Sequence, residues 1–376
     1  MTFLFLKCYD KEVRKKLNSF LKVSYLQLLL GVILVLMTVV GVLLFWNSTK
    51  EAEQILLDKL KLREFTLARA GSLAIGEFFE SRKIRLLILA SLTEIKTIDK
   101  EKGPEIVRKM IYEIQDQPVS AIGVIDKQGK LAWSENPQKQ KVEAGVDLSD
   151  RAYFQWTKTQ KEAGGVYISE PIISRAGPSE GSWIVTVVTP LFNNNQFNGA
   201  IYLSIPVKDL VDKFVLPLTI SSKSSQMIIT QEGLVIASTI PETTGTNILE
   251  EDKKKEGKIK GLSELLDKLI AGQDVSTIME VTYQGGKSTK MVYGYAPIKI
   301  DGTPWYLLVS VPYDEIVEQM FPFSEIQNEG LFLLFIGLIV IILFDVLMVR
   351  IAERQAYRSG YSNCLKESKN YESKKK

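Results

Sequence analysis

An arginine followed at short spacing by aromatic residues is the part of this sequence best suited to bind a small molecule. Arg151 is followed by Tyr153, Phe154 and Trp156. A guanidinium offers five N–H donors in a rigid fork that matches a carboxylate, and aromatic side chains can shield such a contact from water. The spacing therefore predicts a site for a carboxylate-bearing or other polar ligand.

The same residues also admit a purely structural interpretation. Asp150 is placed to cap a short helix, and Arg151 could pair with a local acid such as Asp147. Tyr153 and Phe154 could then belong to a hydrophobic core. Both interpretations stay open from the sequence.

The residue composition excludes several classes of chemistry. Histidine is absent from all 376 residues, so the chain has no phospho-accepting histidine, no Ser-His-Asp triad and no His-ligated metal site. The two cysteines are Cys8 and Cys364, and the sequence has no Gly-rich phosphate loop or paired-carboxylate motif. We therefore expect no enzyme activity, catalytic residues, metal, cofactor or nucleic-acid partner.

Two long stretches are nearly free of charge. Leu26 to Trp46 has no charged residue, and Gly330 to Val349 has one acid, Asp345. About 20 apolar residues in a helix span the roughly 30 Å hydrocarbon core of a bilayer. We predict transmembrane helices at 25–46 and 330–349. The first is predicted to be retained as an anchor, because its apolar run is longer than that of a signal peptide and no small-x-small cleavage site follows it.

Lysine and arginine are concentrated on one side of each apolar stretch. The 20 residues before Tyr25 carry six of them and the 20 after Val349 carry five, whereas residues 310–329 carry none. By the positive-inside rule, we expect a multi-pass protein of the cell membrane with both termini in the cytoplasm and residues 47–329 outside. Both cysteines then lie in the cytoplasm, so we expect no disulfide in the exported region.

The region between the two predicted spans contains an internal repeat. AIGVIDKQGKLAWS from Ala121 aligns with QMIITQEGLVIAS from Gln226, and SIPVKDLVDKF from Ser204 aligns with SVPYDEIVEQM from Ser310. Each copy predicts a β-hairpin, a variable middle, a second hairpin and a short helix. We predict two tandem α+β units, each an antiparallel sheet with helices on one face.

A long stalk helix is predicted before the repeat. Residues 47–98 have no proline and carry apolar residues at helical spacing. A helix of this length needs a partner along its length, either the repeat units of its own chain or a second copy of itself, and we expect a parallel homodimer. The predicted organisation is a basic cytoplasmic N-terminus (1–24), a transmembrane helix (25–46), the stalk helix (47–98), a membrane-distal PAS-like unit (99–214), a membrane-proximal PAS-like unit (215–320), a second transmembrane helix (330–349) and a short basic cytoplasmic tail (350–376).

Three motifs in the first unit, taken together, resemble those of one group of proteins. They are Arg151-x-Tyr153-Phe154, then Tyr167-Ile168-Ser169-x-Pro171, then Thr189-Pro190. With the predicted organisation, they resemble the double Cache family of extracytoplasmic sensor domains, which are related to PAS folds and serve chemoreceptors, sensor kinases and cyclases. The resemblance covers about residues 50 to 320. In that family the membrane-distal unit usually holds the ligand, which implies ligand-binding roles for Arg151, Tyr153, Phe154, Trp156, Tyr167, Ser169 and Ser174.

The chain departs from the amino-acid-binding subgroup of that family. The subgroup has an Arg-x-Trp-Tyr sequence, a tyrosine upstream of it and an aspartate that holds the ammonium of the ligand. Here the aromatic pair is Tyr153 and Phe154, the upstream position is Val146, and Ser174 aligns with the aspartate. These departures argue against an α-amino acid as the ligand.

The resemblance implies a ligand sensor whose output leaves through another protein. Only 27 residues follow Val349, too few for a kinase, a cyclase or a chemoreceptor signalling hairpin. We expect a separate cytoplasmic or membrane signalling partner, unless the chain is a truncated receptor. The alternative is a structural or assembly component of the envelope that uses this fold without a ligand. A polar-lined pocket around Arg151 would favour the sensor. Trp133 and Trp183 lie on predicted strands and are expected in the core.

Overall fold

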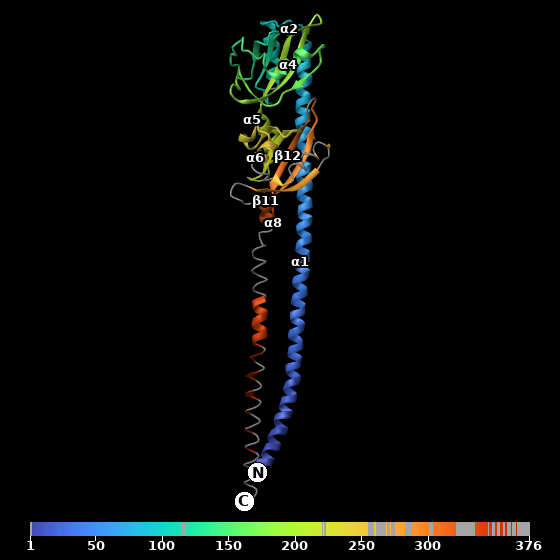
Figure 1. Cartoon of the computed structure of the whole chain (residues 1–376), viewed down its shortest axis with the longest axis vertical. Helices are drawn as coiled ribbons and strands as arrows, with labels where there is room; N and C mark the ends of the chain where they lie inside the picture. The colour runs from blue at the N-terminus through green and yellow to red at the C-terminus, as the bar shows by residue number, and fades with distance from the viewer. Residues whose placement is uncertain are drawn as a thin grey trace. The chain divides into compact units, whose positions relative to one another are not determined.

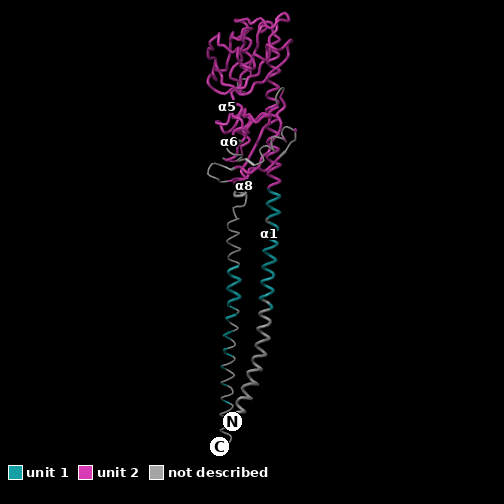
Figure 2. Tube along the Cα trace, viewed as in Figure 1, with its two compact units in different colours: residues 1–56, 318–376 teal, residues 57–317 magenta. Residues whose placement is uncertain are grey.

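A computed structural model describes most of the chain between residues 2 and 320 and part of the segment after it. The described residues are 2–113, 118–219, 221, 223–254, 259–260, 268, 271, 275–282, 288–300, 304–320, 335–344, 346–347, 350–351, 354–355, 358, 362 and 366. They form two compact units, one of residues 1–56 with 318–376 and one of residues 57–317 (Figure 2). Each unit is treated separately below.

The first unit contains the apolar part of helix α1 (Thr2–Ser91). Within its stretch Gly31–Ser91, an apolar window of 18 residues has none of its residues buried, and the stretch is long enough to cross a membrane. The described part of the second predicted span contains the shorter apolar helix Phe335–Phe344. Among the described residues, α1 alone is long and apolar enough to span a bilayer.

In the second unit, α1 ends at Ser91 rather than at the predicted Ile98. Leu92 adopts an extended conformation (φ −73°, ψ 140°), which stops the helix. The short helix α2 (Thr93–Lys96) follows, and Ile98 has a positive φ of 55°. Helix α3 (Lys102–Glu113) then leads to the first sheet.

The first sheet is antiparallel, with strand order β2-β1-β6-β5-β3 and with β4 paired to β5. Gly129 turns β1 into β2 with a φ of +91°, a conformation that favours glycine. Helix α4 (Ala152–Thr159) lies between β2 and β3 in the sequence. The strands are β1 (Ala121–Asp126), β2 (Leu131–Glu135), β3 (Tyr167–Ile168), β4 (Ile172–Ile173), β5 (Trp183–Asn193) and β6 (Gln196–Pro206).

The second sheet is also antiparallel and has strand order β8-β7-β12-β11-β10-β9. Its first four strands repeat the order of the first sheet, and Gly233 (φ +86°) takes the place of Gly129. This confirms two antiparallel α+β units after a long helix. The strands are β7 (Ser225–Thr230), β8 (Val235–Ser238), β9 (Ile259–Lys260), β10 (Val275–Thr282), β11 (Ser288–Ile298) and β12 (Trp305–Pro312).

Short helices connect the two sheets and end the second one. Helix α5 (Val207–Leu210) follows β6 directly and continues as a π-helical turn (Val211–Val215). Helix α6 (Ile248–Lys254) follows β8, and α8 (Tyr313–Met320) follows β12. Each repeated Ser-x-Pro phrase therefore marks the end of a strand and the start of a helix.

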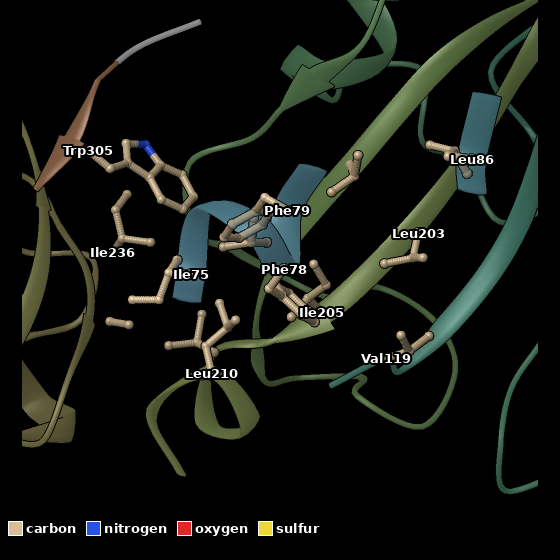
Figure 3. Close-up of a cluster of buried hydrophobic side chains, with 14 of the residues drawn as sticks. Ile75, Phe78, Phe79, Leu86, Val119, Leu203, Ile205, Leu210, Ile236 and Trp305 are labelled. Atoms are coloured by element: carbon tan, nitrogen blue, oxygen red, sulfur yellow. The ribbon is translucent and has the colours of Figure 1, made fainter. Parts of the chain in front are cut away.

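One hydrophobic core joins α1 to both sheets, which follow one another along that helix (Figure 1). Ile75 and Phe79 of α1 are fully buried, and the Phe79 ring packs edge-on against Trp305 of β12 with ring centroids 5.4 Å apart. Figure 3 shows these side chains together with Leu203 and Ile205 of β6. A single helix therefore stabilises both repeats, because its buried residues recur on one face.

The opposite face of the first sheet is covered by α4. Tyr153 and Phe154 pack there against Val188, Ala200 and Tyr202. The prediction of helices on one face is therefore wrong for this sheet. Side chains alternate between faces along a strand, and the inner strands are apolar on both, so each face needs a cover.

Candidate ligand-binding site

A small cavity lies between the start of α4 and the first sheet, around Arg151. Its volume is about 20 Å³, enough for roughly one water molecule. The residues that line it come from the α4 start, β4 and the loop after it, β5 and β6. They are Leu148, Arg151, Tyr153, Ile172, Ile173, Ser174, Arg175, Ala176, Ile184, Thr186, Tyr202 and Ser204.

Arg151 is positioned by the turn that begins α4. Its backbone is extended (φ −68°, ψ 130°), its N–H donates to the Leu148 carbonyl at 3.1 Å, and its own carbonyl accepts the N–H of Gln155 at 2.9 Å. One end of the guanidinium, Nη2, donates to the Ile173 carbonyl at 2.7 Å. The side chain thus connects α4 to β4.

The Arg151 guanidinium forms no ion pair among the described residues. Arg175, its neighbour in the cavity, donates to both carboxylate oxygens of Asp150 at 2.5 and 2.7 Å. Burial, and after it the Arg175 charge, lowers the pKa of Arg151. Its Nε is buried and has no hydrogen-bond partner in the described structure. This geometry suits a bound anion.

Strands β5 and β6 form the other wall, where Thr186 pairs with Ser204 in the register. The Thr186 hydroxyl is buried without a hydrogen-bond partner among the described residues, like Arg151 Nε in the same cavity. Tyr202 lies beside them, and burial raises the pKa of its phenol to about 12. Burial also raises the pKa of Tyr153. Both phenols therefore remain protonated donors at neutral pH.

The proposed structural roles of Asp150 and Arg151 are wrong. Arg151 itself precedes the first helical residue, and no side-chain cap bond forms at that end of α4. The Asp147 carboxylate accepts the Ser149 N–H at 2.9 Å instead of pairing with Arg151. Tyr153 and Phe154 do belong to a buried cluster, although Tyr153 also lines the cavity.

The structure brings together three of the seven predicted ligand residues. Arg151, Tyr153 and Ser174 line the cavity, and the Ser174 hydroxyl donates to the Ala176 carbonyl at 2.9 Å. Phe154, Trp156, Tyr167 and Ser169 are not among the residues that line it.

Those four residues have packing or backbone roles. Phe154 is fully buried, and the Trp156 and Tyr167 rings stack with centroids 5.4 Å apart. The Ser169 hydroxyl donates to the Glu170 carbonyl at 2.8 Å and accepts the Thr186 N–H at 2.9 Å. These two bonds satisfy the Ser169 hydroxyl within the fold.

Sequence reasoning missed Thr186, Tyr202 and Ser204. The position of Thr186 carried a signal, because it lies between the apolar residues Ile184 and Val188 on the inward face of β5. A polar residue at an inward position of a buried strand needs a partner. The partner available to Thr186 depends on which strand lies beside β5 and in which register, and the sequence does not specify either.

Comparison with known proteins identifies the fold. A profile of the family described as Cache domain matches residues 51–320. The extracellular domain of a histidine kinase is similar in structure, with a TM-score of 0.54, 17% identity, and coverage of 70% of this chain and 98% of that one. No protein with a curated description matches the chain.

Two chemoreceptor domains resemble the chain more distantly. The ligand-binding domain of a Pseudomonas fluorescens chemoreceptor in complex with L-serine has a TM-score of 0.48 and 15% identity, covering 68% of this chain and 99% of that one. A Pseudomonas aeruginosa PAO1 amino acid chemoreceptor domain in complex with L-arginine has a TM-score of 0.47 and 14% identity, covering 69% and 97%. From the match over residues 51–320 and the two repeated sheets, the chain belongs to the Cache family and has the double Cache architecture.

Proposed function

We propose that this chain is a membrane-anchored extracytoplasmic sensor that binds a small carboxylate-bearing ligand at Arg151. The supporting observation is that Arg151 Nε and Thr186 Oγ1 are buried in one cavity without hydrogen-bond partners among the described residues. Leaving a buried polar group unsatisfied costs about 1 to 3 kcal/mol. A carboxylate would accept hydrogen bonds from both groups and balance the guanidinium charge.

Binding would require the cavity to enlarge. Its volume of about 20 Å³ is far below that of an ordinary ligand pocket, roughly 300 to 1,000 Å³. Two contacts hold its rim, the Arg151 bond to the Ile173 carbonyl and the Arg175 pair with Asp150. A ligand carboxylate that replaced the Ile173 carbonyl would release β4 from α4. In this proposal the ligand is coupled to a movement of residues 172–176.

The proposed topology has spans at 25–46 and 330–349, both termini in the cytoplasm and residues 47–329 outside the cell membrane. The exposed apolar window in α1 and the exposed apolar helix Phe335–Phe344 support it, as does the distribution of basic residues. Helix α8 follows the last strand of the second sheet without a break. In a bistable dimer, a ligand-induced shift of that sheet would reach the second span as a displacement of about 1 to 2 Å, and through it a separate signalling partner.

We also propose a parallel homodimer through α1. Four large apolar side chains of this helix are exposed in the second unit: Leu62 (64% exposed), Leu73 (52%), Ile84 (50%) and Ile88 (58%). Their spacings of 11, 11 and 4 residues place them on one stripe of a helix. An apolar stripe of this kind is suited to pack against a second copy.

The alternative function is a structural or assembly component of the envelope that binds no ligand. The small volume of the Arg151 cavity is the observation that favours it. In that case Arg151 would only join α4 to β4 through the Ile173 carbonyl. The two functions differ in the effect of a ligand on stability.

Thermal unfolding of the full chain in detergent micelles tests the proposal. The probes are acetate, lactate, succinate and citrate, each compared with its amide. A ligand at a hundred times its dissociation constant adds about 2.7 kcal/mol, a shift of roughly 5 to 10 °C. We expect a shift with a carboxylate, none with its amide, and loss of the shift in Arg151→Gln.

The matched control is Arg108→Gln, which removes a surface pair with Glu135 outside the cavity. This variant should keep the shift. If the carboxylates change the melting temperature of neither the wild type nor the control, the structural alternative gains support.

A further inference from the structure

A second and larger cavity lies between the two sheets of the 57–317 unit. Its volume is about 650 Å³, within the range of small-molecule sites. Ser120, Ser179 and Trp183 line it from the first repeat, and Thr239 and Thr244 line it from the second. Helix α5, which connects the repeats, forms another wall. Its described lining includes none of the residues around Arg151.

Trp183 supplies an aromatic wall to this cavity. The prediction that it belongs to the core is wrong, because 37% of its surface is exposed. One edge of the indole packs on the second repeat, where a Cβ at Gly245 would lie 2.6 Å from Trp183 Cη2. An indole that is open to a cavity on one side is the side chain best suited to hold a cation against its face.

The uncompensated charge in the cavity is negative. Lys208 of α5 forms an ion pair with Asp212, one turn later. Asp209 lies between them in the sequence, is half-buried, and forms no ion pair among the described residues. Burial raises the pKa of its carboxyl, and the Lys208 charge opposes that shift only in part. A cation bound in the cavity would compensate the negative charge of the Asp209 carboxylate.

The other polar groups are hydroxyls rather than further charges. The Ser120 and Ser179 hydroxyls are buried and bond to each other at 2.5 Å. No group of three or more histidine, cysteine, aspartate or glutamate side chains placed to hold a metal ion occurs in the described part of the chain. The lining therefore favours an organic cation that carries polar groups over a metal ion.

We propose that this cavity binds a small organic ammonium ion, with Asp209 as the counter-charge and the Trp183 indole as the aromatic wall. An anion is disfavoured because Asp209 would repel it. Both repeats and the connecting helix line the site, so the ligand bridges the two sheets. This proposal does not depend on a ligand at Arg151, because the two cavities are separate.

Isothermal titration calorimetry of the full chain in detergent micelles tests the site. The probes are choline and ethanolamine, compared with their uncharged counterparts dimethylbutanol and ethylene glycol. We expect at least one ammonium probe to bind, and its uncharged counterpart to bind at least about tenfold more weakly. Asp209→Asn and Trp183→Leu should each weaken ammonium binding by a similar factor.

Two control variants separate this site from other effects. Glu143→Gln removes an exposed carboxylate outside the cavity, and Arg151→Gln alters the other cavity; both should bind the probe like the wild type. Asp209→Asn removes a half-buried uncompensated charge, so it should fold with an unchanged or higher melting temperature. A Trp183→Phe variant keeps an aromatic wall and should retain more binding than Trp183→Leu.

The proposal is overturned if neither ammonium probe binds at millimolar concentration, or if the uncharged counterparts bind equally well. It is also overturned if Asp209→Asn binds the probe like the wild type, or if Arg151→Gln abolishes binding.

Discussion

Glu64 of α1 should make the stability of the protein depend on pH. The residue is fully buried, and α1 crosses the second sheet there so closely that a Cβ on Gly294 would lie 2.1 Å from the Glu64 carbonyl carbon. Neither carboxylate oxygen has a hydrogen-bond partner among the described residues. Burial raises the pKa of Glu64 from 4.5 to about 7, and the charge of Arg63 opposes this only in part.

The direction of the effect follows from where the proton is held. The folded protein keeps the Glu64 proton up to about pH 7, whereas the unfolded chain releases it near pH 4.5. The contribution to stability is therefore complete below pH 4.5 and is lost as the pH rises through 7. At 1.36 kcal/mol for each pKa unit, the loss is about 3 kcal/mol.

The perturbation is Glu64→Gln, which keeps the shape of the side chain and cannot ionise. The stability advantage of the variant over the wild type, measured as free energy of unfolding, should increase by about 3 kcal/mol between pH 4 and pH 8. In thermal unfolding of the full chain in micelles, that corresponds to roughly 5 to 10 °C. Comparison at equal pH removes the contribution of every other titrating group.

The control is Glu77→Gln, because Glu77 is exposed on the same helix. The free energy of unfolding of this variant should differ from that of the wild type by no more than about 0.5 kcal/mol at each pH. The reasoning fails if Glu64→Gln and the wild type lose stability in parallel between pH 4 and pH 8, since the buried carboxylate would then find a partner or water.

Three further variants test other parts of the structure. Gly294→Ala should destabilise the chain by several kcal/mol, seen as a fall in the melting temperature, because its Cβ would collide with the α1 backbone at Glu64. Phe79→Ala should cost about 3 to 5 kcal/mol in denaturant unfolding, because it removes a buried ring packed against Trp305. Thr186→Val should raise unfolding stability by about 1 kcal/mol, since an unpartnered buried hydroxyl is removed, yet weaken carboxylate binding in calorimetry. Equal or lower stability of Thr186→Val would show that the hydroxyl is satisfied within the fold.

Much of the fold could be predicted because its signals are local. The repeated phrases and the glycines at 129 and 233 indicated two copies of one β-hairpin unit, and both sheets have the same order of their first four strands. The end of α1 was placed too late, because Leu92, Ile95 and Ile98 continue the helical spacing of apolar residues although the backbone of Leu92 is extended.

The candidate site could be predicted only in part. Arg151 stood out from its residue type and spacing, and it does line a cavity. Phe154 and Ser169 have the same residue types as many ligand contacts. Phe154 belongs to a buried hydrophobic cluster, and the Ser169 hydroxyl accepts the backbone N–H of Thr186. Thr186 was missed because its role depends on the strand beside it.

The sequence by itself determined the duplication, the apolar stretch of α1, the absence of histidine chemistry and the arginine suited to an anion. These depend on residue types at short spacing, which act the same way wherever the segment lies. Tertiary structure decided which charges stay unbalanced. Asp150 pairs with Arg175, 25 residues later in the chain, and Arg151 forms no ion pair among the described residues. Electrostatic compensation depends on distances of a few ångströms between segments far apart in the chain, and only folding sets those distances.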